Sequence, residues 1–428
     1  MLALVSATDA IMLGWIDQTS LSAVSLAGQV QFVLSLFISG IAAGAGIMAA
    51  QYWGKQDAAS IEKVIPIALR TNLLFSGLFT ILAGFCPEIL MRIFTNDAAL
   101  VASGSQYLRA VALSYVLCGI SQVYLILLKN TGHAAVSSRI SSTAVVLNII
   151  LNAILIYGLC GAPALGIRGA AYATVAARVV ELIWAYLETK KPERVRILWN
   201  RLFSSAGKIL SEDFWRYTLP VLAASLVWGI AYVLYSVIMG HMGSDAVAAN
   251  SITSIAKSLL SCLIRGVSGG AGVLIGNLLG ADELEKAREY GGRLTHLAIA
   301  IGVVTGGLLM LISPAIVHFA PLTDTAAEYL QYMLLFCGLN LMAQSVNTTV
   351  LDGIFCAGGD AKFDMQGNIG AMWCFSVPLG FLAAFWLKLP VMVVYCIVNL
   401  DEIVKLPAVY LHYKKYVWVR NITRDIEE

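Results

Sequence analysis

The sequence predicts an all-α, polytopic membrane protein made of two related helical bundles. Its 428 residues are 59% hydrophobic and only 13% charged, with a mean hydropathy of +0.78. Soluble domains carry about 25% charged residues, so this composition is typical of a chain that spans a bilayer. Long apolar runs and an internal repeat support the same fold class. The net charge of +2 gives no indication of a nucleic-acid partner.

A helix crosses the hydrocarbon core of a bilayer, about 30 Å thick, with about 20 residues. By this length we predict twelve transmembrane helices, six in each half of the chain. They lie near residues 1–16, 22–50, 63–86, 104–128, 136–158, 164–187, 215–241, 248–279, 290–319, 326–357, 364–388 and 390–412. The first segment is short for a span, and we interpret it as a truncated first helix.

The basic residues predict the orientation of these spans. Most Lys and Arg residues fall in one set of alternate loops, which includes Lys190 and Lys191 between the two halves. The opposite loops hold little beyond Arg92, Arg168 and Lys388. Because cytoplasmic loops are enriched in Lys and Arg, we expect a multi-pass protein of the cytoplasmic membrane with both termini in the cytoplasm.

The second half of the chain repeats the first in one constant register. Residues 9–54 align without gaps on 235–280, with small residues matched to small residues: Gly14 with Gly240, Ala23 with Ala249, Gly40 with Gly266, Gly44 with Gly270, Gly46 with Gly272 and Gly54 with Gly280. Each repeat carries six spans, so both copies enter the membrane from the same side. Parallel repeats of this kind occur in transporters, whose substrate sites lie between the halves near the midplane.

The repeat divides the chain into an N-terminal six-helix lobe (residues 1–190), a cytoplasmic linker (191–213) and a C-terminal six-helix lobe (214–428). Apolar and basic residues alternate along the linker. This pattern fits an amphipathic helix on the anionic inner leaflet, and it equally fits a plain tether.

The sequence contains no motif of a common enzyme chemistry. It has no Walker lysine motif, no HExxH and no GxSxG, and its eight cysteines show no metal-ligand or disulfide spacing. The stretch from Gly44 to Ala49 matches a dinucleotide fingerprint only formally, because it lies inside a predicted span with no strand before it. We therefore expect no enzyme activity and no cofactor.

Several short motifs, taken together, resemble those of the MATE (multidrug and toxic compound extrusion) family of transporters. They are Asp9-Ala-Ile-Met-Leu-Gly14, Leu21-Ser-Ala-Val-Ser25, Gln51-Tyr-Trp-Gly54, Leu147-Asn-Ile-Ile-Leu-Asn152, Leu165-Gly-Ile-Arg-Gly169, Leu219-Pro220, Ala248-Ala-Asn250 and Ala357-Gly-Gly-Asp360. The resemblance covers essentially the whole chain apart from the start of the first helix. It implies a two-lobe antiporter that exports cationic or amphipathic organic compounds, such as drugs and xenobiotics, in exchange for Na⁺ or H⁺.

The resemblance also implies a cation-coupling site in the N-terminal lobe. It would consist of the Asp9 carboxylate and side-chain oxygens of Asn148, Asn152 and Thr174. Independently, a carboxylate inside a span is costly and so argues for a function, and Asn148 and Asn152 share one helix face at i,i+4 spacing. A carboxylate surrounded by several neutral oxygens is a ligand set that binds Na⁺. The Asp9 carboxylate by itself is also able to bind a proton, so both coupling ions fit. The alternative is that the asparagines only bridge helices through hydrogen bonds.

The C-terminal lobe differs from one branch of the family, which carries a glutamate where this chain has Trp228 and an aspartate where it has Ser345. We therefore do not expect a cation site of that type there. Trp228, Tyr232 and Tyr235 follow i, i+4 and i+7 spacing, which predicts either an aromatic stripe that contacts flat organic cations or lipid-facing aromatics.

Three further charged residues fall inside the last predicted span. Asp401, Glu402 and Lys405 lie at i,i+3 and i,i+4 spacing, with Lys257 and Arg265 in the eighth span as further partners. They fit an ion-pair latch between helices, and they also fit a proton relay.

The competing hypothesis is a flippase for a lipid-linked precursor from the same wider superfamily. A flippase would favour more than twelve spans and a cavity rich in Arg or Lys, and the sequence indicates neither. A scaffold or channel without transport activity fits poorly with Asp9 and the two-lobe repeat. Beyond the lipid bilayer and a small organic substrate we expect no partner, and we expect a monomer.

Overall fold

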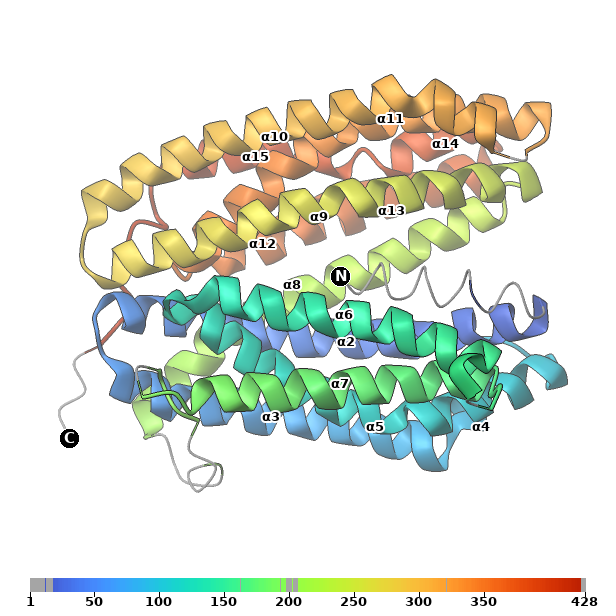
Figure 1. Ribbon diagram of the computed structural model, residues 1–428. Coiled ribbons are helices and arrows are strands. Elements are labelled where there is room, and N and C mark those ends of the chain that lie inside the picture. Colours follow the sequence, from blue (N-terminus) through green and yellow to red (C-terminus); the bar gives the residue numbers. More distant parts are fainter. Residues whose placement is uncertain are drawn as a thin grey trace. The chain divides into compact units, whose positions relative to one another are not determined.

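The computed structural model describes residue 12 and residues 18–161, 163–192, 194–197, 202, 207–320 and 322–424 (Figure 1). Within these ranges the chain is helical and contains no strand. It separates into two compact units: unit 1 comprises Met1–Ala49 and Asp57–Thr218, and unit 2 comprises Ala50–Gln56 and Leu219–Glu428.

Unit 1 is a bundle of long helices. They are α2 (Gln18–Gly54), α3 (Ala58–Phe85), α5 (Ala98–Leu128), α6 (Ala134–Tyr157) and α7 (Ile167–Thr189), with the short α4 (Pro87–Arg92) after α3. α5 packs against both α3 and α7, and α6 packs against α7. Aspartates begin two of these helices: the Ser60 amide donates to Asp57 Oδ1 at 3.0 Å, and the Ala99 amide donates to Asp97 Oδ1 at 2.8 Å. Such N-caps satisfy amides that the first turn leaves without a helical partner.

Unit 2 contains three long helices and several interrupted ones. The long ones are α8 (Lys208–Gly240, from Leu219 onward in this unit), α9 (Ser244–Gly280) and α10 (Leu284–Phe319). The interrupted ones are α11 (Asp324–Thr348) continuing into the π-helical η4 (Thr349–Phe355), and α12 (Ala361–Asn368) continuing through η5 (Ile369–Ser376), α13 (Val377–Phe381) and η6 (Leu382–Trp386). The last are α14 (Val391–Val398) and α15 (Asp401–Tyr413).

The helix boundaries follow the predicted repeat. α2 and α9 are equally long, at 37 residues, and they begin and end at positions that the repeat matches. The starts of α10 and α11 match those of α3 and α5 in the same register. Within unit 2, the ends of α2 and α9 touch reciprocally: a Cβ on Gly54 would lie 2.0 Å from the Asn277 carbonyl oxygen, and a Cβ on Gly280 would lie 1.8 Å from that of Gln51. Only glycine allows this approach of two backbones, which explains why α2 and α9 both end in glycine.

In the described ranges, nine helical segments are long and apolar enough to cross a bilayer. One of them, Ala98–Tyr157, has 60 residues and contains both α5 and α6, which meet at a kink where Gly132 has φ 80°. The predicted span at 390–412 is instead two short helices, α14 and α15, separated at Asn399 and Leu400. Apart from Met12, the predicted first span lies outside the described residues, as do linker positions 198–201 and 203–206.

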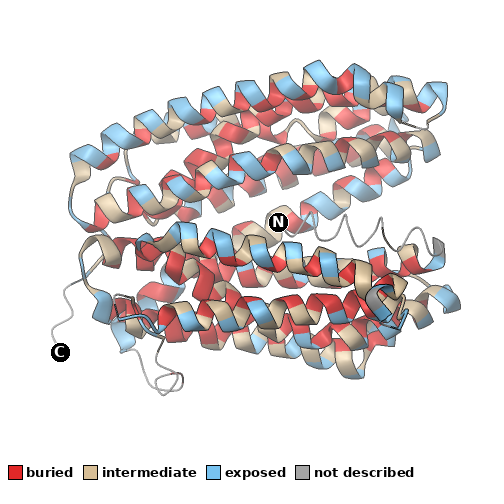
Figure 2. Ribbon diagram, viewed as in Figure 1, coloured by how far each residue is buried: buried red, intermediate tan, exposed pale blue. Residues whose placement is uncertain are grey.

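Buried residues gather on the sides of the helices that face neighbours in the same unit (Figure 2). In unit 1 the core joins α2, α5 and the start of α7, with Leu34, Leu108 and Ala170 at 2% exposure or less. Large apolar side chains such as Leu74, Ile81 and Leu311 are more than half exposed. In a membrane protein such faces contact lipid, which is the expected outer surface of a helical bundle that satisfies its backbone internally.

Candidate functional site

A buried polar cluster lies between α6 and α7 of unit 1. Asn148, Asn152 and Thr174 are 2%, 0% and 5% exposed. Asn152 Nδ2 donates to Asn148 Oδ1 at 3.3 Å, and Asn148 Nδ2 donates to Thr174 Oγ1 at 3.3 Å. Thr174 Oγ1 in turn donates to the Ala170 carbonyl at 3.1 Å. The structure therefore brings three of the four residues of the predicted cation-coupling site into one hydrogen-bonded chain.

Asp9, the fourth predicted member, lies outside the described residues. Met12, three residues further along the chain, does lie beside α6, because its carbonyl accepts a 2.7 Å hydrogen bond from the Tyr157 hydroxyl. Met12 also packs on the core of unit 1. Met12 is thus anchored to the helix that carries Asn148 and Asn152.

An ion pair in unit 1, with a buried carboxylate and a partly buried guanidinium, has a structural character. Arg178 Nη1 lies 2.6 Å from Glu181 Oε2 on α7, and Ser121 Oγ on α5 donates to the same carboxylate at 3.2 Å. The pair compensates its own charge and ties α7 to α5. It therefore adds no charged ligand to the cluster of Asn148, Asn152 and Thr174.

The aromatic residues predicted on the seventh span divide into two groups on α8. The rings of Trp228 and Tyr232 stack, with centroids 5.6 Å apart and an interplanar angle of 17°. The Arg265 guanidinium lies 5.5 Å from the Trp228 ring centroid, within cation–π distance. Tyr235, by contrast, is 9% exposed and belongs to an apolar cluster with Ile238 and its neighbours. Trp228 and Tyr232 form one flat aromatic surface, and Tyr235 is part of the core.

Asp401, Glu402 and Lys405 belong to a buried network in unit 2. Lys405 Nζ lies 3.1 Å from Glu402 Oε1 and 3.6 Å from Asp401 Oδ2. It also donates to Asn368 Oδ1 on α12 at 3.2 Å, and Asn368 Nδ2 donates to Asp364 Oδ1 at 3.1 Å. The three charged residues of the last predicted span are therefore neighbours, and they connect α15 to α12.

Sequence reasoning missed the residues that complete this network. Asn347 Nδ2 on α11 donates to Glu402 Oε2 at 2.8 Å and to the Glu402 carbonyl at 2.6 Å. Asn340, also on α11, accepts from Lys257 Nζ at 3.0 Å and donates to the Asn399 carbonyl at 2.6 Å. The available signal was the presence of asparagines and carboxylates within apolar segments, which is costly unless these groups find partners.

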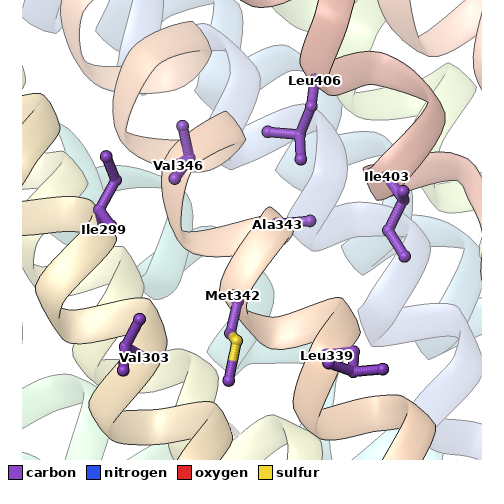
Figure 3. Close-up of a pocket in the computed structure, with 8 residues that line it drawn as sticks. All are labelled: Ile299, Val303, Leu339, Met342, Ala343, Val346, Ile403 and Leu406. Atoms are coloured by element: carbon purple, nitrogen blue, oxygen red, sulfur yellow. The ribbon is translucent and has the colours of Figure 1, made fainter.

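Figure 3 shows an apolar pocket of about 370 Å³ on unit 2. Residues of three helices line it: Ile299 and Val303 from α10, Leu339, Met342, Ala343 and Val346 from α11, and Ile403 and Leu406 from α15. Ile299, Val303 and Leu339 are about half exposed, at 46%, 53% and 52%. Without a polar or charged lining group the pocket cannot compensate a cationic ligand, and it suits a hydrocarbon chain instead.

Comparison with known proteins establishes the family. The MatE family model matches residues 1–154 and 220–382, that is, most of the chain and parts of both repeats. The chain belongs to the MATE family. Its members are membrane transporters, and the multi-pass helical fold described above agrees with that class.

Relatives and solved structures of MATE transporters cover nearly the whole chain. It is 21% identical to the uncharacterized transporter YisQ of Bacillus subtilis (96% of this chain and 90% of that protein). It is 24% identical to the probable multidrug resistance protein NorM of Agrobacterium fabrum (88% and 82%). A structure of a multidrug resistance MATE family transporter of the MOP superfamily in its outward-facing conformation has a TM-score of 0.87 at 20% identity (97% and 92%). A MOP superfamily transporter from Pyrococcus furiosus matches at the same TM-score and identity (97% and 91%). These similarities confirm the predicted MATE resemblance and the all-helical fold.

Proposed function

We propose that this MATE-family chain is a secondary antiporter that exports cationic or amphipathic organic compounds in exchange for Na⁺ or H⁺. The family assignment supports transport, and the names of relatives such as NorM support drugs and xenobiotics as substrates. The observation that carries the coupling mechanism is the buried chain of Asn148, Asn152 and Thr174 in unit 1. A chain of buried polar groups in a membrane-spanning bundle is costly and therefore indicates a function.

The coupling cation would bind at Asp9 together with these three residues. An isolated carboxylate in a medium of low dielectric constant is costly, so Asp9 would be neutralised either by a proton or by Na⁺. Asn148, Asn152 and Thr174 would supply oxygens to the ion or hydrogen bonds to the protonated acid. The anchoring of Met12 on α6 supports this arrangement, because it fixes the chain three residues from Asp9.

Exchange follows if the cation and the organic substrate favour different conformations of the transporter. A ligand shifts a conformational equilibrium only by its difference in affinity for the two states. Coupling between the two ligands is reciprocal, so a cation that favours the substrate-releasing state is itself released when substrate binds. Neutralisation of Asp9 would supply that difference in affinity.

The flat surface of Trp228 and Tyr232 would contact the organic substrate. Stacked aromatic rings attract flat cations, with a contribution of about 0.5–2 kcal/mol for each cation–π contact. Tyr235 would support this surface from the core, since it is buried. The protein would lie in the cytoplasmic membrane with both termini in the cytoplasm, an orientation that the distribution of basic residues supports. It would act as a monomer.

The test is gradient-driven efflux of a fluorescent organic cation from proteoliposomes with an imposed Na⁺ or pH gradient. We expect Asp9→Asn to insert normally and to lose gradient-driven efflux, and we expect Asn152→Ala to weaken ion dependence more than stability. Asp97→Asn is the matched control, because Asp97 is an exposed N-cap and asparagine caps equally well. Normal gradient-driven efflux by Asp9→Asn would disprove the proposed coupling site.

A further inference from the structure

The last predicted span breaks where the buried network of unit 2 is anchored. α14 has 8 residues and α15 has 13, so at about 1.5 Å per residue both are shorter than the hydrocarbon core, which is about 30 Å thick. The break is supported from α11, because Asn340 donates to the Asn399 carbonyl and Asn347 donates to the Glu402 carbonyl, both at 2.6 Å. Discontinuous membrane helices of this kind surround ion and substrate sites in transporters.

The charges around the break do not balance. Asp364, Asp401 and Glu402 are each at most 8% exposed, and Lys405 is 5% exposed. Among the described residues, Lys405 is the one cation within ion-pair distance of any of these three carboxylates. The other charged groups nearby lie elsewhere: Lys257 donates to Asn340, Arg265 is exposed above the Trp228 ring, and Asp352 of η4 is exposed. The remaining nearby charges, Asp360 and His412, pair with each other at 2.6 Å. Three buried carboxylates thus share one buried cation, and burial of an uncompensated carboxylate is strongly unfavourable.

A second group of the network also lacks a partner. Asn347 is 1% exposed, and its Nδ2 donates to the Glu402 carboxylate. The Oδ1 atom of the same amide has no hydrogen-bond donor among the described residues. A buried acceptor without a donor costs about 1–3 kcal/mol. Within the described residues, the network thus holds one buried carboxylate without an ion pair and one amide oxygen without a donor.

Among the three buried carboxylates, Asp364 is the one without an ion pair in the described part of the chain. Asp401 and Glu402 both lie within ion-pair distance of Lys405. In the described part of the chain, no Lys, Arg or His nitrogen lies that close to Asp364, whose one hydrogen-bond partner there is Asn368 Nδ2. The amide of Asn368 connects Asp364 to Lys405, because its oxygen accepts from Lys405 while its nitrogen donates to Asp364.

We propose that Asp364 is a proton-binding site within unit 2, and that Asn368 relays its protonation state to Lys405 at the break in the last span. A proton fits better than Na⁺ because the Lys405 ammonium already occupies the space between Asp401, Glu402 and Asn368 and would repel a second metal-like charge. A proton needs only one oxygen, and it would neutralise the buried carboxylate that has no ion pair. This site is separate from Asp9 and does not depend on the proposed coupling role of that residue.

Protonation would change the connection between α12 and α15. A charged Asp364 strengthens its hydrogen bond from Asn368, since bonds to an ionised acceptor are about twice as strong as neutral ones. This bond in turn fixes the Asn368 oxygen toward Lys405. Neutral Asp364 weakens the bond and releases Asn368. The hydrogen bond from Lys405 of α15 to Asn368 of α12 therefore depends on one proton.

Infrared absorption of protonated carboxyl groups tests the proposal directly in the purified full-length protein. We expect acid-minus-alkaline difference spectra to show a protonated carboxyl band that is present in the wild type and in Asp9→Asn and that is lost in Asp364→Asn. Asp364→Glu keeps a carboxyl group and should shift the band, which provides a test even if Asp364→Asn folds poorly. Asp324→Asn, which changes an exposed carboxylate at the start of α11, should leave the band unchanged.

Two results would overturn the proposal. One is a spectrum that neither Asp364→Asn nor Asp364→Glu alters, which would mean that the network only links the helices. The other is a band that disappears on addition of Na⁺ to Asp9→Asn at constant pH, which would assign the network to a metal cation. Neither result depends on whether Asp9 couples transport.

Discussion

Removal of the Lys405 ammonium should destabilise unit 2 more than removal of any exposed lysine. Lys405 is 5% exposed and contacts Glu402 Oε1 at 3.1 Å, Asp401 Oδ2 at 3.6 Å and Asn368 Oδ1 at 3.2 Å. Lys405→Met has a similar volume, so it removes the charge without a large cavity. Breaking a buried ion pair by removing one partner costs about 3–5 kcal/mol, and here two carboxylates lose their nearest cation.

The double variant Lys405→Met/Glu402→Gln separates charge from packing. Glutamine can still accept the hydrogen bond from Asn347, and the variant removes one of the carboxylates that Lys405 had neutralised. We therefore expect the double variant to lose about 1–3 kcal/mol less stability than the sum of the losses in Lys405→Met alone and Glu402→Gln alone. A coupling of this size is typical of contacting charged residues.

The assay is thermal unfolding of detergent-purified protein, followed by tryptophan fluorescence at one fixed heating rate because membrane proteins often unfold irreversibly. Lys415→Met, at an exposed position after α15, is the control and should melt like the wild type. An apparent melting temperature of Lys405→Met equal to that of Lys415→Met, or strictly additive losses in the double variant, would refute the buried-network interpretation.

Two further predictions concern the aromatic surface and the glycine contacts. Trp228→Ala should change the preference between flat and non-planar organic cations by about two- to thirty-fold, because each cation–π contact contributes about 0.5–2 kcal/mol. Its ion dependence should be unaltered. Trp386→Ala, at an 84% exposed position, is the control and should keep the wild-type preference in the same efflux assay. Gly54→Val should destabilise the protein by about 1–3 kcal/mol through overpacking, because a Cβ there would lie 2.0 Å from the Asn277 carbonyl oxygen. A Cβ on Gly28 would meet no atom within 4 Å, so Gly28→Val should melt close to the wild type. Equal melting temperatures for the two glycine variants would contradict the backbone contact.

The repeat made the fold largely predictable from the sequence. Its register, found from small residues such as Gly54 and Gly280, recurs in the boundaries of α2 and α9. Most predicted spans match a helix within several residues, because apolar length determines a span and capping residues such as Asp57 and Asp97 determine where it starts.

The break between α14 and α15 was not predictable in the same way. Neither glycine nor proline stands at Asn399 or Leu400. The local signals are weaker ones: Asn399 is the C-cap of α14, and Asp401 and Glu402 lie in the first turn of α15. The break depends on hydrogen bonds from Asn340 and Asn347, which lie far from it along the chain. Tertiary contacts of this kind override local helix preference.

The candidate sites were predictable where spacing on one helix determined them. Asn148 and Asn152 lie on one face and do bond to each other, and Trp228 and Tyr232 at i,i+4 spacing do stack. Tyr235 continues the same spacing and yet lies in the core, because periodicity gives the face of a helix but not the identity of its neighbours. Asp364 was missed for the same reason: its importance comes from Lys405 on another helix.

The most direct test of the exchange mechanism measures the ion movement that the organic substrate itself drives. Proteoliposomes without an initial ion gradient would receive an inward gradient of an organic cation, and internal pH and Na⁺ would be recorded together. We predict that H⁺ or Na⁺ leaves as the organic cation enters, and that Asp9→Asn abolishes this counterflow. Uptake of the organic cation with no opposite movement of either ion would contradict antiport.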